Sequence, residues 1–208
     1  MDRDTIIFDF DGTIADSLSF TIEIFRKLTG WQGAQTPEEI ARFRRMPLTK
    51  VVKEVGVPFL QIPSLLMRGR KIMTARITEV PPFPGMSETI HTLHERGHRL
   101  LVMSSNSGQN VKKFLAHNKL DAYFDAVYGN VGLFNKAGAL RRVTRINKID
   151  RNSCFYIGDE QRDVDGARRV GVKVIAVAWG YNDPELLQAH QPFALAHKPA
   201  DILEILRK

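Results

Sequence analysis

Two aspartates stand two residues apart where an apolar run near the start of the chain ends. Asp9 and Asp11 lie in the stretch FDFDGT, at the carboxyl end of a predicted strand, Thr5–Asp9. Unpaired buried carboxylates are costly, and a bound divalent cation would keep both groups ionised. Gly12 permits a tight turn whose backbone N–H groups can face an anion. The alternative is an acidic turn in which Asp11 caps a helix.

A second acidic group follows another apolar run, Ser153–Ile157. Asp159 stands at the end of this predicted strand, and Asp163 follows one helical turn later on the same side, with Glu160 between them. A helix N-cap accounts for one of these carboxylates but not for all three. We therefore expect part of this group to serve the same site as Asp9 and Asp11.

Polar and cationic residues that suit an anion occur at two further positions. Ser104, Ser105, Asn106 and Ser107 follow the predicted strand Arg99–Ser104 and can donate hydrogen bonds to an oxyanion. A polar loop that caps the next helix would have the same composition. Lys136 stands in the first turn of a predicted helix, against the preference of the helix dipole, which suggests a negative partner nearby. A solvated lysine is the alternative.

These residues are spaced by an alternation of short apolar runs and helical segments. Such an alternation predicts an α/β fold with a doubly wound parallel sheet, whose ligands bind beyond the carboxyl ends of the strands. The predicted strands are Thr5–Asp9, Arg99–Ser104, Ala126–Gly129, Ser153–Ile157 and Lys173–Val177. The predicted helices between them are Met86–Arg96, Gly108–His117, a segment with Leu140, Val143 and Ile146 on one face, and Asp163–Val170.

Between the first strand and Met86 the chain has helical patterning and no convincing strand. We predict helices at Ser17–Leu28, from Thr36 as N-cap with Pro37 after it, at Leu48–Val55 and at Leu65–Ile77. A proline-rich stretch, residues 81–85, closes this segment. The predicted organisation is an α/β core of residues 1–16 and 85–208 with a helical cap of residues 17–84.

The charge of the chain is concentrated in this predicted cap. The 208 residues carry a net charge of +7, and residues 17–84, with 11 lysines and arginines against 5 acidic residues, account for +6. A basic surface of this kind attracts nucleic acid, acidic lipid or a small phosphorylated anion. Arg141, Arg142, Arg145 and Lys148 fit the solvent face of a helix without interleaved aromatics, so nucleic acid is disfavoured.

Composition excludes several classes of protein. Hydrophobic residues make up 43% and charged residues 25%, as in ordinary globular domains, and the longest apolar run, residues 174–179, is too short to cross a bilayer. Cys154 is the single cysteine, which excludes an internal disulfide and fits a reducing cytoplasm. We see no secretory leader at the start of the chain. The expected location is the cytoplasm, without membrane association; the oligomeric state is not predicted.

Taken in order, the motifs resemble those of the haloacid dehalogenase-like hydrolase superfamily. The helical insertion resembles that family's small helical cap, and the residues around Gly158 and Trp179 resemble its phosphoglycolate phosphatase-like branch. The resemblance covers the whole chain and rests on the DxDGT stretch from Asp9, then Ser104, Lys136 and the GDxxxD stretch ending at Asp163.

The resemblance implies a phosphatase mechanism with a role for each motif. Asp9 would be the nucleophile that forms an aspartyl-phosphate, and Asp11 the acid and base. Mg²⁺ would be held by Asp9, the backbone carbonyl of Asp11, and Asp159. Lys136 would offset negative charge at Asp9, and Ser104 would contact the phosphoryl oxygens. Asp163 would orient Lys136 or a metal-bound water.

The second aspartate, Asp11, favours phosphoester chemistry, because carbon–halogen cleavage needs neither an acid for an alkoxide nor a metal. The substrate is expected to be a small phosphorylated metabolite, with phosphoglycolate as the first candidate. A phosphomutase and a non-catalytic regulatory or binding protein remain alternatives. Further candidate substrate contacts are Gly12, Ser105, Asn106 and, from the cap, Arg44 and Arg45.

Two other features are interpreted as structural. His91, His94 and His98 would not share a helix face, because Gly97 ends the helix before His98. Trp179 and Tyr181 follow the last predicted strand and could contact the cap or substrate, or pack at the hinge.

Overall fold

A six-stranded parallel sheet forms the centre of the computed structural model, which describes residues 3–132 and 135–207. The strand order is β3-β2-β1-β4-β5-β6, so β1 lies in the middle between β2 and β4. Parallel strands buried on both faces require near-continuous apolar sequence, which the inner strands have after their first residue. The strands are β1 (Thr5–Phe8), β2 (Arg99–Met103), β3 (Ala126–Tyr128), β4 (Cys154–Gly158), β5 (Lys173–Val177) and β6 (Ala194–Ala196).

Helices cover both faces of this sheet and bury two apolar clusters. Alternate residues of a strand point to opposite faces, so Ile6 and Phe8 pack into one cluster and Ile7 into the other. The first cluster receives α5 (Met86–Glu95), α6 (Gly108–His117) and α10 (Pro199–Ile205). The second receives α7 (Lys136–Ile146), α8 (Gln161–Val170) and α9 (Pro184–Ala189). The core is therefore a three-layer α/β arrangement.

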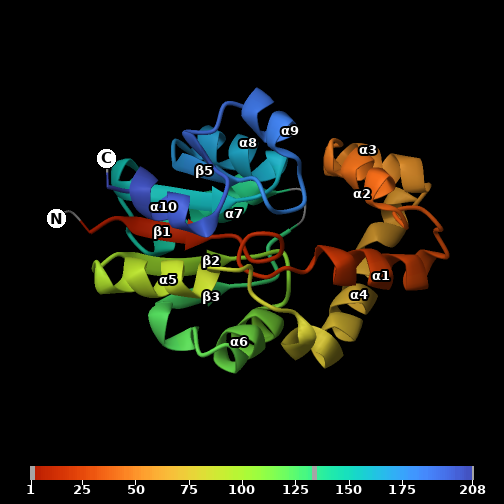
Figure 1. The fold of residues 1–208 in the computed structure, drawn as a ribbon, viewed down its shortest axis with the longest axis horizontal. Coiled ribbons are helices and arrows are strands. Elements are labelled where there is room, and N and C mark those ends of the chain that lie inside the picture. The colour runs from red at the N-terminus through yellow and green to blue at the C-terminus, as the bar shows by residue number, and fades with distance from the viewer. Residues whose placement is uncertain (1–2, 133–134, 208) are drawn as a thin grey trace.

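The residues between β1 and α5 form a separate group of helices. In Figure 1 they lie to one side of the sheet, on the side opposite the two chain ends. Thr36 accepts from the Glu39 N–H while the Glu39 carboxylate accepts from the Thr36 N–H, which is a complete capping box. The group consists of α1 (Leu18–Thr29), α2 (Pro37–Arg44), α3 (Leu48–Val55) and α4 (Ile62–Arg76), with short 3₁₀ turns at Phe59–Gln61 and Ile77–Glu79.

The five predicted strands are confirmed, with ends shifted by one residue or none, and so are the predicted helices. The last strand, β6, was not predicted, because three residues give too little pattern. Ile146 is 54% exposed, so the buried face of α7 is Leu140 and Val143 without it. Residues 1–2, 133–134 and 208 of the predicted core lie outside the described residues.

The structure also bears on the histidines, on the basic residues of α7 and after it, and on membrane spans. The His91 and His94 rings pack against Tyr123, whereas His98 lies near Asp4, so the three do not form one group. Arg141, Arg142, Arg145 and Lys148 are exposed, as expected for a solvent face. Within the described residues, no helix is both long and apolar enough to cross a membrane.

Candidate active site

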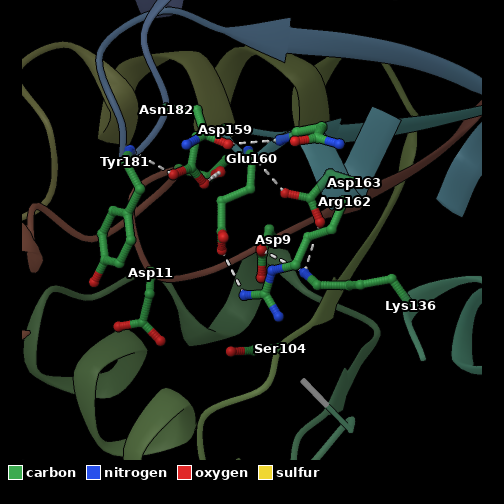
Figure 2. Close-up of polar contacts among 12 residues, drawn as sticks. Asp9, Asp11, Ser104, Lys136, Asp159, Glu160, Arg162, Asp163, Tyr181 and Asn182 are labelled. Atoms are coloured by element: carbon green, nitrogen blue, oxygen red, sulfur yellow. Dashed lines mark hydrogen bonds and ion pairs between the residues drawn. The ribbon is translucent and has the colours of Figure 1, made fainter. Parts of the chain in front are cut away.

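The predicted catalytic residues converge where the central strands end. Figure 2 shows Asp9 and Asp11 from the end of β1, Ser104 from the end of β2, Lys136 from the first turn of α7 and Asp159 from the end of β4. Asp9, Ser104, Lys136, Asp159 and Asp163 are all buried. Because β2 and β4 both pair with β1, the sheet register brings these residues together although they lie up to 154 positions apart in the chain.

Lys136 is held by two carboxylates. Its Nζ lies 2.5 Å from Asp9 Oδ2 and 2.8 Å from Asp163 Oδ1, and it donates to the Tyr156 hydroxyl at 3.0 Å. Burial alone would lower the pKa of Lys136, but the charges of Asp163 and Asp9 raise it, so the amine stays protonated. The sequence predicted a negative partner for this lysine, and the structure shows two, Asp9 and Asp163.

Both carboxylate oxygens of Asp9 accept hydrogen bonds. Its Oδ1 accepts from the Phe10 N–H at 2.8 Å, and its Oδ2 accepts from Lys136. Burial raises the pKa of Asp9 to about 7 in spite of the opposing Lys136 charge. Full ionisation of this carboxylate at neutral pH therefore needs more positive charge than Lys136 supplies.

Asp159 is anchored through both oxygens. Oδ1 accepts from the Thr13 hydroxyl at 2.7 Å, and Oδ2 accepts from the Tyr181 N–H at 2.7 Å. Burial, followed by the charges of Glu160, Asp9 and Asp163, raises the pKa of Asp159 well above its usual value. Gly12 adopts φ +77°, and a β-carbon there would overlap Asp159 Oδ2 and the Tyr181 ring, so this position requires glycine.

This donor set fits a divalent cation. Oxygens of Asp9, Asp159 and Asp163 lie within 4.8 Å of one another, and all three residues are buried. Hard cations such as Mg²⁺ prefer carboxylate oxygens, and a cation would offset the burial that raises the pKa of Asp9 and Asp159. Asp163 Oδ1 already pairs with Lys136, and its Oδ2 accepts from the Glu160 N–H. The oxygens of Asp9 and Asp159 likewise each accept a hydrogen bond, so these bonds do not rank the three carboxylates as ligands.

Asp11 lines the same cavity as Asp9 and is held by polar groups. The Ser17 hydroxyl donates to Oδ1 at 2.9 Å, and Asn106 Nδ2 donates to Oδ2 at 3.1 Å. Asn110 fixes Asn106 in turn, through a 2.9 Å bond from its Nδ2 to Asn106 Oδ1. Burial raises the pKa of Asp11 above its usual value, the direction that favours the protonated carboxyl group.

The remaining predicted contacts divide into two groups. Ser105 and Asn106 line the cavity that contains Asp9 and Asp11, and the Ser104 hydroxyl accepts from the Asn106 N–H at 2.9 Å. The Gly12 N–H donates to the Ala15 carbonyl at 3.0 Å, so the structure does not support an anion contact there.

The cap arginines Arg44 and Arg45 contact the core. Arg44 donates to the Ala178 carbonyl at 3.0 Å, and Arg45 pairs with Asp183 at 3.2 Å. Neither residue is among those that line the cavity with Asp9 and Asp11. Arg44 and Arg45 thus link α2 to the segment after β5, and their contact with substrate stays a prediction.

Several residues at the site were not assigned a role from the sequence. Glu160 and Arg162 form an ion pair at 2.5 Å beside Asp9 and line the same cavity (Figure 2). The nearby carboxylates, first that of Glu160, raise the pKa of Arg162 against the effect of burial. The alternation of β4 could have placed Tyr156 on one face of the sheet, but its contact with Lys136 depends on tertiary packing.

The segment after β5 connects the site to the helices of residues 17–84. The Tyr181 hydroxyl lies 3.1 Å from Ser17 Oγ and 2.7 Å from Thr21 Oγ1, while Trp179 Nε1 donates to the Thr13 carbonyl at 3.1 Å. Asn182 donates to the carbonyls of Arg44 and Met46 and accepts from the Gln161 N–H. Tyr181 and Trp179 are therefore packing residues at the junction, and Tyr181 also lines the cavity.

Comparison with known proteins identifies the protein family. A family model described as haloacid dehalogenase-like hydrolase matches residues 6–177. A phosphoglycolate phosphatase of Synechococcus elongatus is 33% identical over 201 residues, 96% of this chain and 95% of the relative, and a 5'-nucleotidase of Pseudomonas aeruginosa is 26% identical over 95% of this chain and 91% of its own. A crystal structure of a predicted phosphatase from Clostridium acetobutylicum has the same fold, with a TM-score of 0.84 at 23% identity and full coverage of both chains.

The chain therefore belongs to the haloacid dehalogenase-like hydrolase family. Within this family it is a phosphatase. The resemblance inferred from the motifs is confirmed, as is the α/β fold that it implied.

Proposed function

We propose that this phosphatase hydrolyses a small phosphate monoester through an aspartyl-phosphate on Asp9, with Mg²⁺ as its cofactor. The observation that carries the proposal is the buried contact of Lys136 with Asp9, beside Asp159 and with Asp11 in the same cavity. A dianionic ester is repelled by bare carboxylates. Lys136 supplies one positive charge against this repulsion, and Mg²⁺ held by the carboxylates would supply more.

The first half-reaction transfers the phosphoryl group to the enzyme. An oxygen of Asp9 attacks phosphorus as the bond from phosphorus to the leaving oxygen breaks, and Asp11 gives its proton to the departing alkoxide. Lys136 and Ser104 stabilise charge on the carboxylate and on the phosphoryl oxygens. The pKa of Asp11, raised by burial, supports its role as the acid.

The second half-reaction returns the enzyme to its starting state. Asp11, now ionised, takes a proton from water as that water attacks phosphorus, and the bond between Asp9 and phosphorus breaks to release inorganic phosphate. Asp9, Asp159 and the backbone carbonyl of Asp11 would hold Mg²⁺, which supplies charge neutralisation and polarises the phosphoryl group when bound.

Residues 17–84 act in this proposal as a cap over the core formed by residues 1–16 and 85–208. The contacts of Tyr181 with Ser17 and Thr21 support a hinge at the start of α1. Closure of such a cap excludes water and brings substrate contacts to the site. The net charge of +6 on residues 17–84 favours a small anionic substrate. The buried Cys154 thiol fits a reducing cytoplasm.

Release of inorganic phosphate tests the proposal directly. Phosphoglycolate is the first candidate substrate, because the relative that is 33% identical is a phosphoglycolate phosphatase. Purified protein should release phosphate from phosphate monoesters with Mg²⁺ and stop when EDTA is added in excess. Turnover that persists after thorough removal of metal, or no turnover of any monoester with Mg²⁺, would overturn it.

A further inference from the structure

The cavity above the nucleophile extends far from the catalytic carboxylates into the cap. It has a volume of about 250 Å³ and is lined at one end by Asp9, Asp11, Ser105 and Asn106. Glu160, Arg162 and Tyr181 of the core also line it, and the remaining walls come from α1, from α3 with Val57 after it, and from α4. In the proposed reaction the phosphoryl group lies beside Asp9 and Asp11, so the space between the cap helices is available to the leaving group.

The cap walls of this cavity are almost entirely apolar. Three cap segments each contribute side chains, which are buried or half-buried. Non-polar walls of this kind bind apolar surface by removing it from water, and they offer no partner to a charged group. The apolar lining residues of the cap are Ile24, Phe25, Leu28, Leu48, Val52, Val57, Ile62, Leu65, Leu66 and Met73.

The two polar side chains that the cap contributes to this lining already have partners. Thr21 Oγ1 lies 2.7 Å from the Tyr181 hydroxyl. The Arg70 guanidinium donates to the Ser105 backbone carbonyl and approaches Asn130 Oδ1 at 3.5 Å. Arg70 thus lies at the edge where the cap meets the core, and the deeper walls carry hydrocarbon.

Most lysines and arginines of the cap lie away from this cavity. Among the described residues of the lining, Arg70 is the one contribution from the eleven lysines and arginines of residues 17–84. Arg42 pairs with Glu54, and Arg76 pairs with Glu23 and Glu79, all on the outer surface. The basic surface can steer anions toward the protein. The cations of the described lining are Arg70, at the edge between cap and core, and Arg162 of the core, which pairs with Glu160, so the apolar walls of the cap carry no cation for a second anionic group of the substrate.

We propose that the preferred substrate is a phosphate monoester whose alcohol has an apolar body, such as an aromatic ring or a branched alkyl group. The inference rests on the proposed phosphatase function and names the leaving group of that reaction. Each methylene buried against these walls should strengthen binding by about fourfold. A carboxylate in the same place would lose its hydration without gaining a partner.

Binding of non-hydrolysable phosphonates tests the inference without turnover. Three ligands share the phosphonate and differ in the group at the far end: propylphosphonate, 3-phenylpropylphosphonate and 3-phosphonopropionate, the last an isostere of phosphoglycolate. Calorimetric titration of the wild-type protein with Mg²⁺ should give 3-phenylpropylphosphonate a dissociation constant about 30-fold lower than that of propylphosphonate. Equal affinities, or tightest binding of 3-phosphonopropionate, would overturn the inference.

Turnover of matched primary alkyl esters distinguishes this inference from the proposed function. Ethyl phosphate, 2-phenylethyl phosphate, phosphoglycolate and adenosine 5'-monophosphate are compared by kcat/KM at fixed Mg²⁺. The inference expects 2-phenylethyl phosphate to be hydrolysed best, and a preference for phosphoglycolate or the nucleotide refutes it while leaving the phosphatase intact. If no ester is hydrolysed, the proposed function fails, and the order of phosphonate binding still decides what the cavity prefers.

Two variants of neighbouring residues on α4 test whether the preference for 3-phenylpropylphosphonate comes from the cavity wall. Leu66 lines the cavity, whereas Met67 is 67% exposed on the same helix. Leu66→Asn should reduce the affinity ratio of 3-phenylpropylphosphonate to propylphosphonate about tenfold, and the matched control Met67→Asn should keep the wild-type ratio. A ratio that is unchanged in Leu66→Asn, or lowered equally in both variants, contradicts the assignment of this wall.

Discussion

The Nζ of Lys136 lies 2.5 Å from Oδ2 of Asp9 at the buried centre of the site. This contact places a fixed positive charge beside the proposed nucleophile, and Asp163 holds the amine from the other side at 2.8 Å. The geometry allows the roles of nucleophile, counter-charge and positioning residue to be separated by substitution.

Asp9→Asn should abolish turnover and retain the fold. The amide keeps the shape of the side chain but is a far weaker nucleophile, so kcat should fall by about 10³-fold or more. Phosphate release measures the loss, and circular dichroism checks the fold. Asp121→Asn on the exposed surface is the matched control and should hydrolyse substrate like wild type. Substantial hydrolysis by Asp9→Asn would remove Asp9 as nucleophile.

Lys136→Met should lower kcat by about 10²-fold or more, because the carboxylate and the phosphoryl oxygens lose their buried counter-charge. Asp163→Asn should have a smaller effect, about tenfold, since the lysine remains but loses its second carboxylate partner. The two variants are compared by kcat and KM at saturating Mg²⁺. A larger loss in Asp163→Asn than in Lys136→Met would contradict the assignment of Asp163 as the positioning residue.

Metal binding should reverse a pH-dependent loss of stability. Burial raises the pKa of Asp9 from 3.8 to about 7, so the folded protein binds a proton that the unfolded chain releases between these values. The contribution of Asp9 to stability is therefore full below pH about 4 and is lost as the pH rises through about 7. In EDTA, the melting temperature of wild type minus that of Asp9→Asn should fall between pH 5 and pH 7.5.

Saturating Mg²⁺ at pH 7.5 should raise the melting temperature of wild type more than that of Asp9→Asn, because the ionised carboxylate is the form that binds the ion. The same addition at pH 5 should have a smaller effect. An equal Mg²⁺ response of the two proteins at both pH values would show that Asp9 does not contribute to metal binding.

The sequence predicts the site well where short-range pattern and strand order determine position. Asp9, Ser104 and Asp159 each follow an apolar strand, and parallel strands bring their carboxyl ends to one edge. The lysine at the start of α7 was also recognisable, because its place in the first helical turn calls for a negative partner.

Contacts between the cap and the core could not be predicted in the same way. They depend on how two helical groups meet in space, which no periodicity encodes. The bond from Arg44 to the Ala178 carbonyl is one such contact. The apolar wall containing Leu66 also appears only when α1, α3 and α4 are packed over the site, since its residues come from three separate helices.

Asn182→Ala should loosen the junction between cap and core. The Asn182 side chain joins the carbonyls of Arg44 and Met46 to the Gln161 N–H, and it is 6% exposed. The Arg44 carbonyl keeps its bond from the Asp183 N–H, but the Met46 carbonyl and the Gln161 N–H lose the Asn182 side chain, so the free energy of unfolding should fall by about 1–3 kcal/mol.

The kinetic effect of Asn182→Ala should appear mainly in KM, because a cap that closes less readily binds substrate more weakly while the carboxylates at the strand ends stay in place. Urea denaturation and initial-rate kinetics measure the two effects in the same preparation. Asn152→Ala, on the exposed turn before β4, is the matched control and should change neither. A fall in stability without a rise in KM would show that Asn182 supports the fold but not closure of the cap.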